Sequence, residues 1–358
     1  KEINKMEYLT AINNPLNNIN ETNIQYLNIF NNPSLVYGNP LNSDKVDFCK
    51  YTQEIQDDMV QFGPFVNNAM QHFKTASCGC RIRFRTTSRK LVFRVEFKRS
   101  AYFSDIVGWN AFGFEIYIVD SKGHYTHHRL MAPQDGFRIF ADQIPLPPNS
   151  AVCIFLPNFN TILNMRMGIE RGSRITKFPY PKNKRTPILF YGGSIAQGAS
   201  ASKSGNSYPN IVSRNLNQDI INLSIKHCCK ATDNTAKFIG SLDCDSIVID
   251  YSQEVPNEEI FSKTYERFYK NVRKYHPDKK IILLTTPSFN RWKEYESFDD
   301  IIIKTYEKAI ARGENTLLLN QKELFDKKEY DLIAIENNQF TDYGMYKVAN
   351  KLCELLKT

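Results

Sequence analysis

The sequence predicts an α/β protein of two domains, in which a jelly-roll-like antiparallel β-sandwich precedes a domain with a five-stranded parallel sheet. Two observations predict this division. Short strands of alternating polarity fill the first half, and strand-like and helix-like runs alternate in the second. A chain of 358 residues is long enough for two domains, and a hydrophobic content of 42% supplies a core for each.

The first domain is predicted over residues 46–178. Residues 1–45 are rich in Asn, which favours turns, so we expect an irregular lead-in there. In the run 91–98 apolar residues alternate with charged ones, as in a half-buried strand. Turn-forming residues separate the further strand candidates, which are 112–119, 136–141, 151–156 and 162–169.

The second domain is predicted over residues 179–358, after a linker at 177–185 that carries two prolines and four basic residues. Repeated β-α units favour a parallel sheet with helices on both faces. The predicted strands are 187–193, 219–224, 246–251, 280–286 and 316–320. The predicted helices are 207–216, 230–240, 258–275, 297–312 and 342–357.

Ser194 stands at the end of the first of these strands. The apolar run 187–191 ends in Gly192-Gly193-Ser194, and the two glycines allow a tight turn and a close backbone approach. In parallel α/β folds the functional site lies at the carboxyl ends of the strands. Ser194 is therefore the first candidate for a nucleophile.

Composition limits the other classes of function. The net charge of +8 is scattered along the chain, and Arg81, Arg83 and Arg85 on one strand are weak evidence for nucleic-acid binding. No apolar run reaches membrane-spanning length. Eight cysteines without a disulfide-type spacing predict a reducing, cytoplasmic compartment. Because the chain begins with Lys and not Met, a leader peptide removed from its N-terminus is an open alternative. No cofactor or metal is expected.

The segment 191–198, followed by Ser-Gly-Asn-Ser-Tyr-Pro at 204–209, resembles the first conserved block of SGNH/GDSL hydrolases. The stretches 80–86 and 113–117 resemble sandwich strands of the two-domain, carbohydrate-esterase-like type, so the resemblance covers about residues 75–358. It implies a flavodoxin-like second domain and hydrolysis of acyl esters. It also implies a serine nucleophile, a histidine base with its aspartate partner, and an oxyanion held by backbone N–H groups and an asparagine.

When the family's residues are matched position by position, the resemblance assigns the nucleophile to Ser194, but no histidine stands at the position of the general base. Thr341, Asp342 and Gly344 fix the register of the last block, which places Gln339 at the histidine and Glu336 at the aspartate. A glutamine amide does not accept a proton near neutral pH, so Gln339 cannot activate a serine.

The resemblance also places the oxyanion site, with Gly193 and Ser224 as pocket residues. His227 stands where the second block has its glycine, and Glu254 or a neighbouring residue stands at the asparagine of the third block. A carboxylate there would repel a developing oxyanion. The base and two of the oxyanion donors are therefore replaced.

His227 is the candidate for a substitute base, because its loop should border Ser194. The run His227-Cys228-Cys229 could supply a displaced base, a thiol nucleophile or metal ligands. The favoured interpretation is a loop that changed after the oxyanion site was lost. His276 is interpreted as a helix-end partner, and His124, His127 and His128 as residues of an exposed polar loop in a hairpin of the sandwich. The sixth histidine is His72.

Two functions follow from these residues. The favoured one is a protein with the esterase fold that has lost hydrolysis and binds a small molecule, a glycan, an acylated ligand or a protein partner. The alternative is an active esterase or acyltransferase that uses Ser194 and His227. A basic surface for an acidic polymer is a weaker third hypothesis. Trp109 is the first guess for a sandwich residue at the pocket, with core packing preferred for it.

Overall fold

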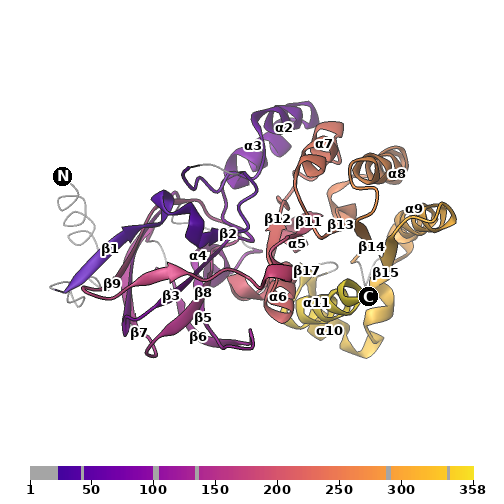
Figure 1. The fold of residues 1–358 in the computed structure, drawn as a ribbon. Coiled ribbons are helices and arrows are strands. Elements are labelled where there is room, and N and C mark those ends of the chain that lie inside the picture. The colour runs from indigo at the N-terminus through magenta and orange to yellow at the C-terminus, as the bar shows by residue number, and fades with distance from the viewer. Residues whose placement is uncertain (1–22, 42–43, 100–104, 134–136, 288–291, 337–338) are drawn as a thin grey trace.

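The structure is a computed structural model that describes two packed parts of one chain (Figure 1). One part is an antiparallel sandwich and the other a parallel sheet flanked by helices. The described residues are 23–41, 44–99, 105–133, 137–287, 292–336 and 339–358. In this part of the chain no helix has the length and apolar character needed to cross a membrane.

The predicted sandwich is confirmed. One sheet has the strand order β1-β9-β4-β7, and the other has the order β10-β3-β8-β5-β6 with β2 paired to β3. Aromatic side chains close the space between the sheets; the rings of Phe93 and Phe114 stack with centroids 5.6 Å apart. The strands are β1 (Ile24–Asn28), β2 (Val36–Tyr37), β3 (Arg81–Thr86), β4 (Lys90–Phe97), β5 (Phe114–Val119), β6 (Tyr125–Met131), β7 (Ile139–Pro145), β8 (Ser150–Phe155), β9 (Ile162–Glu170) and β10 (Ile175–Lys177).

Two segments differ from the expectation. Residues 24–28, expected to be irregular, form β1 and pair with β9, because the ladder and the buried Ile24 outweigh the turn preference of the neighbouring asparagines. Residues 53–73, expected to belong to an all-β domain, form the helices α2 (Gln53–Asp58) and α3 (Pro64–Phe73). The buried apolar residues of these helices and of the short turn between them recur at helical spacing: Ile55, Met59, Val66, Ala69, Met70 and Phe73.

The second part holds the predicted five-stranded parallel sheet, in the order β12-β11-β13-β14-β15. The first strand of the domain therefore lies second in the sheet, which is the flavodoxin-like order. The strands are β11 (Ile188–Gly192), β12 (Ile220–Asn222), β13 (Ser246–Asp250), β14 (Lys280–Leu284) and β15 (Thr316–Leu319).

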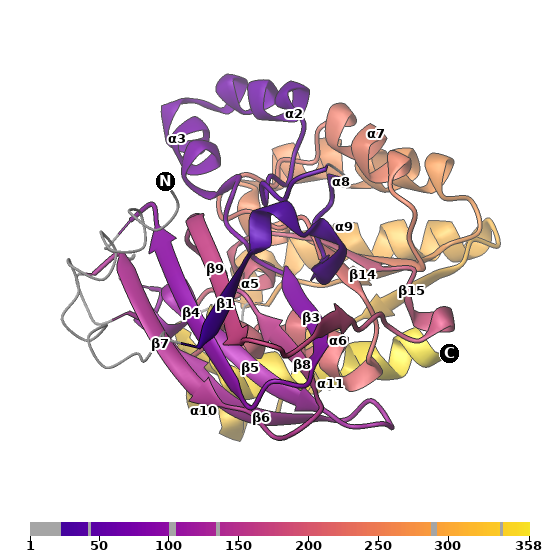
Figure 2. The ribbon, with the colours of Figure 1, turned by 60° about the vertical axis from the view of Figure 1, so that its left-hand side comes forward.

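Helices cover both faces of this sheet, as Figure 2 shows. Alternate strand residues pack against α6 and α11 on one face and against the α7–α9 layer on the other. The helices are α4 (Gly108–Phe112), α5 (Ser194–Gln197), α6 (Tyr208–Leu216), α7 (Asp233–Ser241), α8 (Glu258–Tyr275), α9 (Trp292–Ala311), α10 (Tyr330–Ile333) and α11 (Asp342–Lys357). Before α11, β16 (Ala334–Glu336) and β17 (Gln339–Phe340) form a small antiparallel pair that the sequence did not predict.

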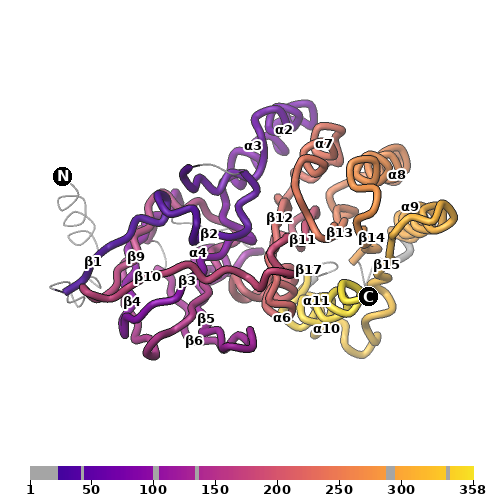
Figure 3. Tube along the Cα trace, in the orientation of Figure 1, coloured from indigo at the N-terminus to yellow at the C-terminus, as the bar shows by residue number. Residues whose placement is uncertain are grey.

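The sandwich packs against the edge strand β12 of the parallel sheet (Figure 3). Arg81 of β3 is fully buried, pairs with Asp219 and donates to the Ile220 carbonyl at 3.1 Å. Arg83 is also buried and stacks over the Tyr180 ring, 3.8 Å from its centroid. These arginines therefore join the two parts instead of forming a basic surface.

Arg81→Ala should destabilise the protein by about 3 kcal/mol, because it removes a fully buried guanidinium group and leaves Asp219, whose side chain is 16% exposed, without its ion-pair partner. Urea unfolding followed by circular dichroism measures this. Arg85→Ala is the matched control on the same strand, since Arg85 is exposed, and it should change the free energy of unfolding by less than about 1 kcal/mol. Equal losses in the two variants would contradict this account of the interface.

Candidate active site

Ser194 lies where the sequence predicts it, directly after β11 and at the first residue of α5. Its side chain is partly exposed, and its hydroxyl makes no hydrogen bond to any residue that the structure describes. The Gly193 N–H donates to the carbonyl of Asp250 at 3.2 Å, which ties the turn to the end of β13. The serine is thus presented at the carboxyl edge of the sheet.

Glu254 fills the space in front of the Ser194 backbone. Its Oε1 accepts a hydrogen bond from the Ser194 N–H at 3.0 Å. A Cβ placed on Gly193 would meet the same oxygen at 2.1 Å, so only glycine permits this approach. The family resemblance assigns this N–H to the oxyanion, and here a carboxylate oxygen takes it.

Burial makes this carboxyl group hard to ionise. Glu254 is 6% exposed, and desolvation raises its pKa to about 7, although Lys230 and backbone hydrogen bonds from Ser194 and His227 act in the opposite direction. The backbone N–H groups of Ser194 and His227 therefore both favour the ionised form of the Glu254 carboxyl. The acceptor at this point is an oxygen of the protein itself, Glu254 Oε1.

His227 adopts a backbone conformation that glycine favours. Its φ of 69° lies in the left-handed region, which a residue with a Cβ rarely adopts. Its ring packs on Phe65, with centroids 4.8 Å apart, and makes no hydrogen bond to Ser194 or to another described residue. Burial and nearby lysines lower the pKa of His227. The ring is neutral near pH 7 but is not placed as the serine's base.

Gln339, which the resemblance places at the histidine position, has both ends of its side-chain amide engaged by other residues. Its Oε1 accepts from the Ser200 hydroxyl at 2.8 Å, and its Nε2 lies 3.5 Å from an oxygen of Asp105. The same carboxylate oxygen pairs with Lys226. The side chain of Glu336 lies outside the described residues. The place of the base is therefore held by groups that satisfy one another.

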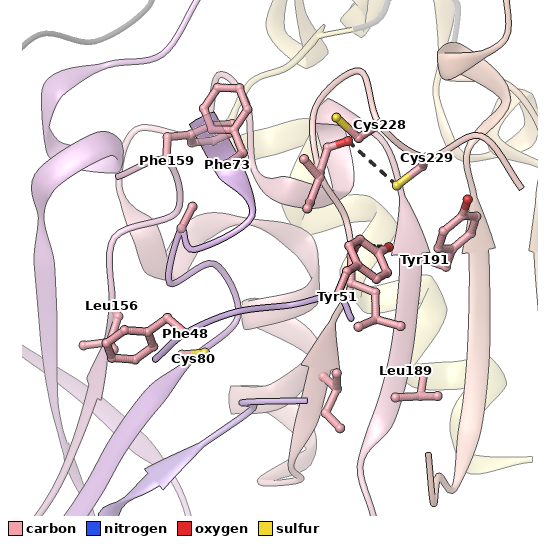
Figure 4. Packing of buried hydrophobic residues seen from close by; sticks show 14 of the residues in the cluster. Phe48, Tyr51, Phe73, Cys80, Leu156, Phe159, Leu189, Tyr191, Cys228 and Cys229 are labelled. Carbon is pink, nitrogen blue, oxygen red and sulfur yellow. Dashed lines mark hydrogen bonds between the residues drawn. The ribbon is translucent and has the colours of Figure 1, made fainter. Parts of the chain in front are cut away.

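The other residues of the second block are buried. Ser224 is fully buried, and its carbonyl accepts from Lys50 at 2.8 Å. Cys228 and Cys229 lie in the interior near Tyr51 and Tyr191 (Figure 4). Burial raises the pKa of Cys229 to about 12 and raises that of Cys228 as well, so neither is a thiolate nucleophile at neutral pH. Among the described residues no cluster of three His, Cys, Asp or Glu could hold a metal ion.

Sequence reasoning missed the contribution of the sandwich to this site. Asp105 lies in the loop for which Trp109 was the first guess, but Asp105 is the residue that reaches Lys226 and Gln339. Trp109 is 62% exposed and lines a separate cavity with His127 and His128, so neither the pocket contact nor the core packing is observed. A lone acidic residue in a loop carries no local signal for such a contact.

Two family models match the chain. The model of the GDSL-like lipase/acylhydrolase family matches residues 185–357, and the model of the N-terminus of SGNH-hydrolase-type esterases matches residues 25–175. The chain belongs to the SGNH/GDSL hydrolase family. Among curated proteins, none matches it.

Solved structures share the fold of this SGNH/GDSL protein. A Bacteroides ovatus protein described as a GDSL-like lipase is 20% identical, with a TM-score of 0.77 over 94% of this chain and 98% of that one. A salicylyl-acyltransferase from a tetracycline biosynthetic pathway is 15% identical, with a TM-score of 0.69 over 92% and 93%. A family two carbohydrate esterase from Clostridium thermocellum is 12% identical, with a TM-score of 0.57 over 78% and 92%.

The pKa of Glu254 predicts a pH dependence of stability. Between about pH 4.5 and pH 7 the carboxyl is ionised in the unfolded chain but protonated in the folded one, so the free energy of unfolding falls as pH rises. Glu254→Gln should flatten this fall by at most about 3 kcal/mol. Urea unfolding at several pH values measures it. The exposed Glu258→Gln is the control, and the same flattening in that variant would refute the assignment.

Proposed function

We propose that this SGNH/GDSL family member is a binding or accessory protein that has lost ester hydrolysis. The observation that carries the proposal is the 3.0 Å hydrogen bond from the Ser194 N–H to Glu254 Oε1. A tetrahedral intermediate would have to place its oxyanion where this oxygen lies. Loss of one oxyanion donor alone costs about 3–4 kcal/mol of transition-state stabilisation.

The histidine position supports the same proposal. Gln339 accepts from Ser200 and lies near Asp105, so the network is complete without a substrate. A serine hydroxyl is a weak nucleophile until a base takes its proton, and Gln339 offers no such base. Retention of Ser194 is then explained by its place at a tight turn rather than by a reaction.

The ligand is proposed from chemistry that the family handles. One fold neighbour is an esterase solved in complex with cellohexaose, and another is a salicylyl-acyltransferase. A glycan, an acylated small molecule or a protein partner are thus the classes to test first.

All eight cysteines are free thiols, which supports a reducing, cytoplasmic setting.

An assay with p-nitrophenyl acetate and a fluorophosphonate probe tests the loss of hydrolysis. The natural chain should hydrolyse the ester no faster than Ser194→Ala and should not be labelled at Ser194, since the oxyanion and base positions are both replaced. Labelling of Ser194 that disappears in His227→Ala would overturn the proposal in favour of the rewired esterase or acyltransferase.

A reversion variant tests the same positions in the opposite direction. Glu254→Asn, His227→Gly and Gln339→His together restore the residues that the family resemblance implies, and hydrolysis should rise by about a hundredfold or more. Adding Ser194→Ala to this variant should abolish the gain. A gain that survives Ser194→Ala would show that the serine is not the nucleophile and that these positions do not act through it.

A further inference from the structure

The cavity beside Trp109 has a volume of about 460 Å³ and lies on the sandwich. Its walls come from the run 127–132 at the end of β6, from Asp142 of β7 and from Trp109 of α4. β6 ends one sheet and β7 ends the other, and both lie at the lower side of the sandwich in Figure 1. Neither Ser194 nor Gln339 lines this cavity, so it is a space apart from the family site.

Trp109 exposes most of its surface at this cavity. The residue is 62% exposed, whereas tryptophan is on average one of the more buried residue types. Its backbone is held in the α4 turn, where the Gly113 N–H donates to the Trp109 carbonyl at 3.0 Å. A large flat ring held at the surface by an ordered backbone provides a surface on which a ligand can stack.

The polar side chains of the cavity wall are open to solvent. His127 and Arg129 are exposed, and Asp142 is partly exposed. One oxygen of Asp142 accepts from the Gln143 N–H at 2.8 Å, and neither Asp142 nor Arg129 takes part in an ion pair among the described residues. The wall therefore offers both hydrogen-bond donors and an acceptor to a ligand.

The fixed charges of the wall, those of Arg129 and Asp142, are opposite and cancel. Burial and the positive charge of Lys203 lower the pKa of His127. The His127 ring is thus neutral near pH 7 and carries one donor and one acceptor. A ligand without net charge fits such a wall better than an anion or a cation does.

A sugar ring matches both parts of this wall. Its C–H groups form an apolar face with a partial positive charge, which stacks on the negative face of an indole, and its hydroxyl groups donate and accept hydrogen bonds at the rim. An aliphatic ligand would leave the polar groups unused. A nucleobase also stacks on an indole, but a nucleic-acid site adds a basic groove for phosphates, and here Arg129 is balanced by Asp142.

We propose that the cavity beside Trp109 binds a neutral glycan, with one sugar ring stacked on the indole and its hydroxyl groups bonded to Arg129 and Asp142. The inference rests on the proposed function in that it names one ligand class for a binding protein. Neither Ser194 nor Glu254 takes part in it, so it can be measured independently of hydrolysis.

Isothermal titration of the full chain with four neutral hexasaccharides tests this: cellohexaose, xylohexaose, mannohexaose and N-acetylchitohexaose. At least one should bind with a Kd of about 1 mM or below. Trp109→Ala should weaken this binding about tenfold or more, because it removes the stacking surface, whereas Trp109→Phe keeps a ring and should stay within about threefold. Asp142→Ala should weaken it by about threefold or more through the lost acceptor.

Tyr275→Ala is the matched control, since Tyr275 is an aromatic residue of α8 that is 44% exposed and lies outside the cavity wall. This variant should bind the glycan like the natural chain. Circular dichroism confirms that each variant is folded.

Three results would overturn the proposal. These are no binding of any of the four glycans up to about 10 mM, equal binding by Trp109→Ala and the natural chain, and tighter binding of adenosine monophosphate than of any glycan, which would indicate a nucleobase site. The esterase assay separates this proposal from the proposed function. A chain that hydrolyses esters yet binds a glycan through Trp109 refutes the loss of hydrolysis alone, and an inactive chain that binds none of the glycans refutes the glycan site alone.

Discussion

The edge strand β12 is the constraint on which the site depends. An edge strand leaves backbone groups unpaired, and here side chains of the N-terminal part take its carbonyls and those of the following loop. Arg81 donates to Ile220, the Tyr51 hydroxyl to Leu223 at 2.5 Å, and Lys50 to Ser224 at 2.8 Å. Strand β3 and the segment before α2 therefore hold β12 and the start of the loop that carries Lys226 and His227.

This loop completes a pocket in which the polar groups form hydrogen bonds and an ion pair with one another. The Ser194 N–H donates to Glu254, and the amide of Gln339 is engaged by Ser200 and by the carboxylate that pairs with Lys226. An active hydrolase must instead keep its oxyanion donors open for the transition state.

The replacements also act on one another through burial. An asparagine at the position of Glu254 would be neutral, whereas the carboxyl brings a charge that burial disfavours and that raises its pKa to about 7. Its second oxygen is buried and has no hydrogen-bond partner among the described residues. One carboxyl group thereby occupies the expected oxyanion site and leaves a second, buried acceptor unpaired beside it.

The sequence alone determined the elements whose signal is local. The period of apolar residues predicted α8 at 258–275, the order of strands and helices predicted the parallel sheet, and the Gly-Gly-Ser turn placed Ser194. The sequence also assigned Gln339 to the histidine position through the register of Thr341, Asp342 and Gly344, and this assignment stays a prediction. Only the tertiary structure decided which distant groups meet: Asp105 with Lys226, Arg81 with Asp219, and the Glu254 carboxyl with the Ser194 N–H. These contacts join segments 60 or more residues apart, and their energies depend on burial and distance, which no local pattern of residues encodes.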